Sequence, residues 1–198
     1  MTKGIVSGVV SNMVTLRVDG PVLQGEICYI TTGGDRLMAE VIKVVGSDVY
    51  VQVFESTRGL KVGSQAEFTG HQLEIQLGPG MLSKNYDGLQ NDLDKMDGVF
   101  LRRGQYTEPL DADRLWDFEP IVKAGDRVEG SAWLGKVEEN HQPLKIMAPF
   151  TLKGTAVVKS IVPAGQYKVH DTIAVLTTEA GEDINVTMVQ RWPVKFAM

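Results

Sequence analysis

The chain has 198 residues, of which 43% are hydrophobic and 23% are charged, and its formal net charge is −5 at pH 7. This composition is typical of a folded globular protein and excludes a disordered chain. The acidic charge and the scattered basic residues argue against nucleic acid as a partner, and no stretch approaches the roughly 18 apolar residues of a membrane span, so no direct membrane insertion is expected.

The first 70 residues are predicted to form a small closed β-barrel. In Met13–Val18, alternation places Val14, Leu16 and Val18 on one face, as a half-buried strand requires. Turn-forming residues recur at the roughly 8–12-residue spacing of all-β folds, with no long helix between them. The six expected strands are Lys3–Val10, Met13–Val18, Gly25–Thr32, Leu37–Val45, Asp48–Ser56 and Gln65–Gly70.

Cys28 is the only cysteine, which excludes a disulfide framework and a cysteine metal site. It lies among apolar residues in Gly25–Thr32, so a buried core side chain is favoured over a nucleophile. The N-terminal residues do not follow the pattern of a signal peptide, and we therefore expect a cytoplasmic location.

The periodicity loosens from residue 71 to residue 118, which we interpret as a connector with little core of its own. Two short helical turns are expected there, around Asn91–Met96 and around Asp111–Trp116. Acidic residues in the first turn of the second segment support that expectation.

A second strand-rich unit begins near Pro120 and contains a degenerate repeat. Val122–Asp126 and Val162–Gln166 each place a glycine turn before a strand, at an offset of 40 residues. Two similar halves predict a flattened barrel or sandwich. The chain is therefore expected to be mainly β, with a barrel followed by a barrel-sandwich domain.

Two motifs are similar to known ligand-binding loops but lack residues that those loops require. Gly130–Val137 has the spacing of a phosphate-binding P-loop, but Val137 stands where Ser or Thr should bind magnesium, and flanking Val-Gly pairs indicate a hairpin. Asp92–Gly98 is faintly similar to a calcium loop, but the twelfth position holds Arg103 rather than a glutamate. We therefore interpret it as a solvated acidic turn.

The histidines also lack the spacing of metal ligands. No His, Cys or carboxylate neighbours them at ligand spacing, and no nucleophile with a base can be assembled from the sequence. We therefore predict no catalytic residue, no cofactor-binding residue and no metal ligand in this chain. The three histidines are His71, His141 and His170.

An alternative function rests on Lys145. The segment Leu144–Leu176 resembles the biotinyl and lipoyl carrier domains, in which a hairpin lysine is modified and Ala-Pro follows. Lys145 would be that lysine, although Leu144 replaces the usual methionine. We favour a shared sandwich fold without the carrier chemistry, because fold does not imply function.

Three segments stand in a fixed order along the chain. FESTRGL spans Phe54–Leu60, LGPGMLSKNYDGLQ spans Leu77–Gln90, and QRWPVK spans Gln190–Lys195. Together they resemble the catalytic A subunit of vacuolar/archaeal-type rotary ATPases. The family's motifs are Tyr/Phe-Glu-x-Thr-x-Gly-Leu, Leu-Gly-Pro-Gly-Leu-Leu with Tyr-Asp-Gly-Ile-Gln-Arg-Pro, and Gln-x-Trp-Pro-Val-Arg.

The resemblance implies a division of the chain and a set of structural motif residues. Residues 1–70 would be the N-terminal barrel, 71–118 a connector along the side of the nucleotide-binding domain, 119–186 the bulge domain, and 187–198 the start of the nucleotide-binding domain. Glycines 78, 80 and 88 would provide tight backbone geometry and close packing without phosphate. The motif residues are Gly59, Leu60, Gly78, Pro79, Gly80, Tyr86, Asp87, Gly88, Gln90, Trp192 and Pro193.

The resemblance also implies partners and two departures. ATP and magnesium would bind the parent subunit, noncatalytic B subunits would alternate with it in a ring, and the bulge would face peripheral stalk subunits. We expect the chain to be a fragment that is peripheral to the membrane as part of the complex, is not itself an enzyme, and is monomeric alone. Asn91-Asp92 replaces the family's Arg-Pro, and the family's P-loop, catalytic glutamate and nucleotide-binding domain would lie beyond Trp-Pro-Val, where this chain ends.

Overall fold

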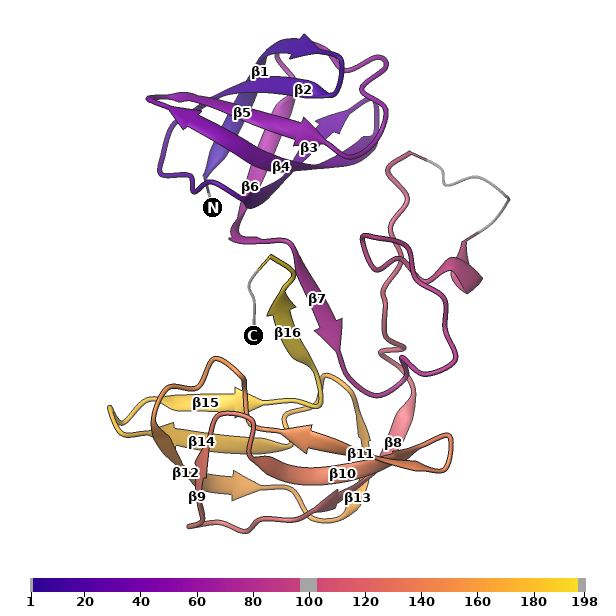
Figure 1. Ribbon diagram of the computed structural model, residues 1–198, viewed down its shortest axis with the longest axis vertical. Coiled ribbons are helices and arrows are strands. Elements are labelled where there is room, and N and C mark those ends of the chain that lie inside the picture. Colours follow the sequence, from indigo (N-terminus) through magenta and orange to yellow (C-terminus); the bar gives the residue numbers. More distant parts are fainter. Residues whose placement is uncertain (1, 97–102, 196–198) are drawn as a thin grey trace. The chain divides into compact units, whose positions relative to one another are not determined.

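The structure is a computed structural model that describes residues 2–96 and 103–195 (Figure 1). It contains two compact units. Among the described residues, the first unit comprises 2–75, 95–96, 103–107 and 193–195, and the second comprises 76–94 and 108–192. Nearly all the regular structure is strand, which confirms the predicted mainly β class.

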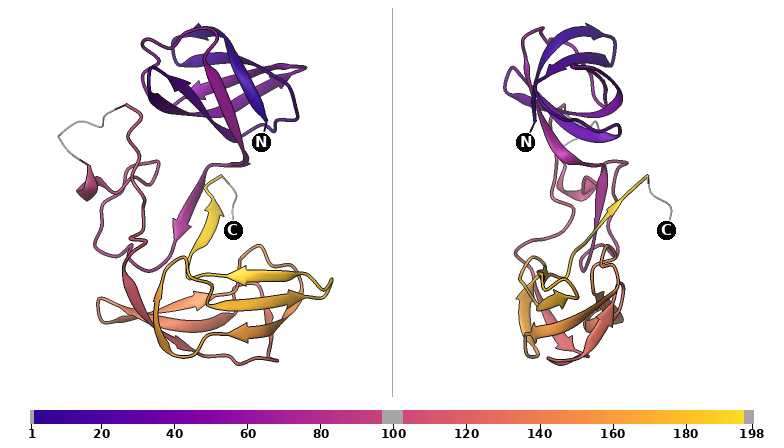
Figure 2. Two further views of the ribbon diagram at one scale, coloured as in Figure 1. Left: turned by 180° about the vertical axis from the view of Figure 1, so that it is seen from behind. Right: turned by 90° about the vertical axis from the view of Figure 1, so that its left-hand side faces the viewer.

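The first unit is the predicted closed barrel, with strand order β1-β2-β5-β4-β3-β6 (Figures 1 and 2). Every neighbouring pair is antiparallel. Because β6 pairs with both β1 and β3, the sheet is closed and leaves no open edge. Val14, Leu16 and Val18 are buried, as the alternation in β2 predicts. The strands are β1 Lys3–Val10, β2 Met13–Val18, β3 Glu26–Thr32, β4 Asp35–Val45, β5 Asp48–Val53 and β6 Gln65–Gln72.

The second unit contains a sandwich of two four-stranded sheets, ordered β11-β10-β8-β13 and β15-β14-β12-β9. Figure 2 shows the sheets as separate layers in its right-hand view. The first half of the sandwich contains β8 Leu115–Pro120, β9 Arg127–Glu129, β10 Trp133–Glu139 and β11 Gln142–Met147. The second half contains β12 Thr155–Ile161, β13 Gly165–Lys168, β14 Ala174–Thr178 and β15 Asp183–Val186.

The strand order explains the sequence repeat. Val122–Asp126 leads into β9 and Val162–Gln166 leads into β13, so each repeat segment introduces the second strand of its half. Those two strands are exchanged: β9 pairs with β12, and β13 pairs with β8. Each half therefore contributes three strands to one sheet and one strand to the other, and neither half completes a sheet alone.

The intervening segments contain little regular structure. β7 Glu74–Leu77 pairs with β16 Gln190–Pro193 in a two-stranded sheet, and the boundary between the units falls within each strand. The helical turn expected around Asn91–Met96 is the 3₁₀ helix Leu93–Lys95. The one expected around Asp111–Trp116 is wrong. Asp111 Oδ1 instead accepts the backbone N–H groups of Asp113 and Arg114, which closes a turn directly before β8.

Candidate functional site

The glycine loop Leu77–Leu82 is packed tightly into the second unit. A Cβ on Gly78 would lie 3.1 Å from the carbonyl oxygen of Met188 and 3.2 Å from Cδ1 of Leu110. Gly80 has φ +102°, a conformation that side chains rarely adopt. A side chain at Gly78 would therefore crowd its neighbours, and one at Gly80 would strain the backbone.

The backbone N–H groups of the same loop bind the side-chain carboxylate of Glu139. Oε1 of Glu139 accepts the backbone N–H of Gly80 at 2.9 Å and that of Leu82 at 3.1 Å. Glu139 ends β10 and is only 3% exposed. Two convergent amide groups are the usual means of holding a phosphate or carboxylate. Here a strand carboxylate fills the site and fastens the loop to the sandwich.

The second half of the loop is organised by Asp87 and Gln90. Asp87 Oδ1 accepts the N–H groups of Leu89 and Asn91, both within 2.9 Å, and its Oδ2 accepts the side-chain amide of Asn91. Gln90, at φ +62°, exchanges two hydrogen bonds with the backbone of Gln76. Each polar side chain therefore replaces a backbone pairing that this irregular segment lacks.

Tyr86 and Gly88 complete the loop motif. The Tyr86 hydroxyl donates to the carbonyl of Pro109 at 2.8 Å, and burial raises the pKa of that phenol. The expectation for Gly88 is wrong, because its φ lies outside the left-handed region and a Cβ added there would meet no other atom within 4 Å. Gly88 lies on the exposed side of the turn.

Asn91 and Asp92, the two residues that differ from the Arg-Pro of the resemblance, both have partners within the loop. The Lys84 ammonium donates to Oδ2 of Asp92 at 2.9 Å, and Asp92 is 1% exposed. That hydrogen bond raises the pKa of Lys84, so the ammonium remains charged beside the buried carboxylate. Asp92 is thus paired with Lys84, and Asn91 with Asp87, within the loop.

The P-loop-like segment has a structural explanation. A Cβ on Gly130 would lie 2.9 Å from the carbonyl of Leu152, and one on Gly135 would lie 2.3 Å from the ring of Phe118. β10 and β11 form the predicted hairpin here, and Lys136 forms an ion pair with Glu119 at 2.7 Å. Gly135 serves close packing between strands, Gly130 packs against the segment between β11 and β12, and no helix N-terminus follows either glycine.

Lys145 does not occupy the hairpin position of a carrier lysine. It lies within β11 opposite Lys136, away from the turn between Glu139 and Gln142. Its ammonium rests 4.7 Å from the ring centroid of Trp133. The arrangement is that of a strand residue shielding an aromatic ring.

The remaining motif residues lie at separate places. Gly59 has φ +76°, and Leu60 packs partly against the barrel core. Trp192 meets Phe150 edge-to-face at 5.3 Å, and Pro193 ends β16. The structure thus brings together the motif residues of the Leu77–Gln90 loop, and it leaves Gly59 and Leu60 in the first unit.

Sequence reasoning missed Glu139 and Lys84. The burial pattern of β10 places Glu139 on the same inward side as Val137. A carboxylate at an inward strand position requires an internal partner, so that alternation could have identified it.

Neither a metal-ligand cluster nor a membrane-spanning helix is found in the described part of the chain. No group of three or more His, Cys, Asp or Glu side chains there could hold a metal ion, and no helix in residues 2–96 or 103–195 is long and apolar enough to cross a membrane. The calcium-like segment Asp92–Gly98 is described only in part, because residues 97 and 98 lie outside those ranges.

Comparison with known proteins matches both units. Residues 6–70 match the family model for the ATP synthase alpha/beta family, beta-barrel domain, and residues 107–195 match that for the ATP synthase alpha/beta subunit barrel-sandwich domain. The chain belongs to the ATP synthase alpha/beta family.

Individual relatives match along the whole chain. It is 44% identical over 200 residues to the V-type ATP synthase alpha chain of Treponema denticola, covering 100% of this chain and 34% of that one. The alpha chains of Borreliella afzelii and Borrelia turicatae are 43% and 44% identical over 98% of this chain, again covering 34% of each relative. The chain therefore spans about a third of the length of these family members.

Proposed function

We propose that this chain is the N-terminal part of the catalytic A subunit, or alpha chain, of a V/A-type ATP synthase/ATPase. The observation that carries the proposal is the 44% identity across the whole chain, with barrel and barrel-sandwich domains in the same order. The complete subunit would hydrolyse or make ATP, with magnesium, coupled to proton or sodium transport. It would be cytoplasmic and peripheral to the membrane within its complex.

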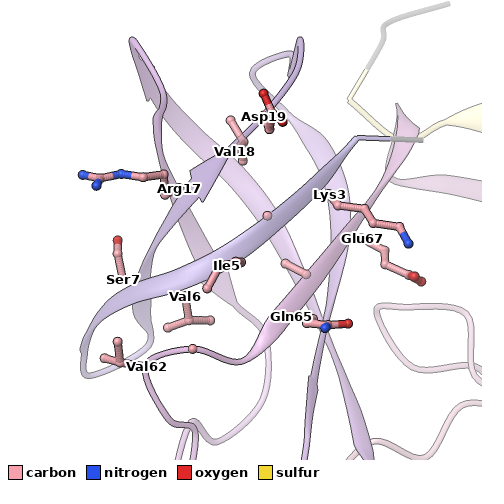
Figure 3. Close-up of a pocket in the computed structure, with 13 residues that line it drawn as sticks. Lys3, Ile5, Val6, Ser7, Arg17, Val18, Asp19, Val62, Gln65 and Glu67 are labelled. Atoms are coloured by element: carbon pink, nitrogen blue, oxygen red, sulfur yellow. The ribbon is translucent and has the colours of Figure 1, made fainter.

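This part of the subunit would serve assembly. The barrel would stand beside noncatalytic B subunits in an alternating ring, and the sandwich would contact peripheral stalk subunits. A mainly apolar groove of about 660 Å³ on the barrel supports the first contact (Figure 3). Ile5 of β1 and Val62 before β6 line it and are 56% and 67% exposed, which is typical of a surface that a partner covers.

Catalysis would belong to the rest of the subunit. Lys136 is paired with Glu119 in a strand, and the glycines before it are required for packing. Calorimetric titration of this chain with Mg-ATP should therefore show no micromolar binding, and Lys136→Ala should give the same trace. A saturable isotherm that Lys136→Ala abolishes would contradict this assignment.

The assembly role can be tested by mixing the chain with the noncatalytic B subunit of the same complex. Analytical ultracentrifugation should detect a one-to-one complex. Ile5→Asp should weaken it by about tenfold or more, because a charge would be buried in an apolar contact. Ile121→Asp, at a 49% exposed sandwich position, is the matched control and should leave binding unchanged. Equal binding of the B subunit by the wild type, Ile5→Asp and Ile121→Asp would contradict the proposal. So would the absence of any complex with the wild type.

A further inference from the structure

A short segment after the glycine loop lies on the barrel and belongs to the first unit. Residues 103–107 are assigned to it, although the residues that follow belong to the second unit. Arg103 Nε lies 3.6 Å from Oδ2 of Asp35, and its guanidinium donates to the carbonyl of Arg58. We call residues 103–107 the strap.

One carboxylate receives most of the strap's polar contacts. Glu55 Oε1 accepts the backbone N–H of Gly104 at 3.1 Å and the hydroxyl of Tyr106 at 2.8 Å. Its Oε2 accepts the N–H of Met38 on β4 at 3.2 Å, and that N–H also donates to the Tyr106 hydroxyl at 2.8 Å. Glu55 thus joins the strap to a barrel strand through three donors.

The fit around these bonds is close. A Cβ on Gly104 would lie 3.3 Å from the backbone nitrogen of Arg36, and Gly104 has φ +70°. The ring of Tyr106 meets Tyr29 edge-to-face, with centroids 6.1 Å apart. Burial, and then the hydrogen bond to Glu55, raise the pKa of Tyr106, so its hydroxyl stays protonated and able to donate. The strap therefore fits closely against a complementary surface of the barrel.

The barrel core is complete without the strap. The core cluster of the barrel comprises residues from β1 to β6 and no residue of the strap. Strap residues 103–107 are all half-buried, and Arg103, Gly104 and Tyr106 each hold the strap to the barrel through hydrogen bonds. The free energy that holds the strap is thus concentrated in polar contacts and can be lost separately from the barrel.

We propose that Glu55 anchors a releasable strap, and that the Arg103–Thr107 segment opens from the barrel as a unit while the barrel remains folded. This assigns a positioning role to the glutamate of FESTRGL that goes beyond assembly. Glu55 fixes where the chain leaves the barrel on its way into the sandwich. It does so by holding the strap against the first residues of β4.

Amide hydrogen exchange by NMR on the full chain tests the proposal. In the wild type, Gly104 should exchange through a local opening that is nearly independent of denaturant, whereas Val51 in β5 should exchange only on global unfolding. Glu55→Gln should speed Gly104 exchange by roughly 10–100-fold, because hydrogen bonds to a charged acceptor are lost. Tyr106→Phe should have a smaller effect, since Gly104 keeps its acceptor.

Two matched variants control for the substitutions. Glu67→Gln changes an exposed glutamate of β6, and Tyr50→Phe changes a 36% exposed tyrosine of β5. Neither should alter Gly104 exchange. Unchanged Gly104 exchange in Glu55→Gln would overturn the proposal. So would equal acceleration of Gly104 and Val51, because Glu55 would then stabilise the barrel rather than anchor a separable strap.

Discussion

Gly135 illustrates why a residue pattern can suggest the wrong chemistry. In the sequence it is the second glycine of a phosphate-loop spacing, and in the fold it is the position where β10 passes the ring of Phe118. Both arrangements require a residue without a side chain, so the glycine alone cannot distinguish them. Only the strand context separates the two, and the sequence predicted that context from the flanking Val-Gly pairs.

Replacing Gly135 should destabilise the sandwich strongly. In Gly135→Ala the new Cβ would lie 2.3 Å from the Phe118 ring and 2.8 Å from the Glu119 carbonyl, so the strands must separate. We expect a loss of about 1–3 kcal/mol or more in the free energy of unfolding, as for other overpacked cores. Urea unfolding measured by tryptophan fluorescence suits this test, because Trp116, Trp133 and Trp192 all lie in the second unit. Gly88→Ala should be nearly neutral, and equal midpoints for the two variants would refute the packing argument.

The thiol of Cys28 should be inert in the folded barrel. Burial, and secondarily the charge of Glu26, raise its pKa to about 12 from 9.0. Because the folded pKa is the higher one, this group's contribution to stability is present below about pH 9 and is lost as pH rises toward 12. At pH 8 a disulfide reagent should label Cys28 only after unfolding in urea. Native labelling at the rate of an exposed Ser7→Cys control would contradict this.

At the level of elements, local alternation predicted the barrel strands well, and pairing between distant segments was not accessible. All six barrel strands lie where the apolar periodicity placed them. The exchange of β9 and β13 between sheets could not be inferred, because it depends on pairing between residues that are 26–30 positions apart for β9 and 47–53 apart for β13 rather than on local pattern. The turn at Asp111 was misread because an acidic residue can cap a helix or close a turn with the same hydrogen bonds.

The attachment of the glycine loop to β10 should depend on Glu139. Glu139→Ala leaves the N–H groups of Gly80 and Leu82 without their acceptor, at about 1–3 kcal/mol for the buried Gly80 N–H and less for the partly exposed Leu82 N–H. Tryptophan-monitored urea unfolding should show a lower midpoint. Glu138→Ala, one residue earlier with an exposed side chain, should unfold like the wild type. An unchanged midpoint in Glu139→Ala would contradict this prediction. It would mean that the packing of Gly78 and Gly80 alone holds the loop.

For the whole molecule, the order of the three motifs carried more information than any one of them. FESTRGL follows β5 in the barrel unit, the glycine loop belongs to the second unit, and QRWPVK forms β16 and the residues after it. Three motifs in a fixed order along the full length of the chain identify the fold more specifically than any single residue does. The partners of Glu139 and Glu55 could not be predicted, because Glu139 accepts from backbone groups 57 and 59 residues away, and Glu55 from Gly104, 49 residues away.

We predict that the chain alone is monomeric. In the proposed ring its barrel faces noncatalytic B subunits, so the contact surfaces would be heterologous and close only with the right neighbour. A barrel of this size also offers limited area, whereas stable interfaces bury about 1,200–2,000 Å² in total. Exposed apolar side chains, such as Leu82 at 49%, should permit weak association at high concentration.

Multi-angle light scattering at micromolar concentration tests this prediction. The measured mass should be near the 21.7 kDa of one chain. Ile5→Asp should leave that mass unchanged, because the groove that Ile5 lines would bind the B subunit and not a second copy of this chain. A stable trimer or hexamer that Ile5→Asp dissociates would show instead that the groove binds another copy of this barrel. In that case the barrel could form a ring without the noncatalytic subunits, and alternation would have to be imposed elsewhere in the subunit.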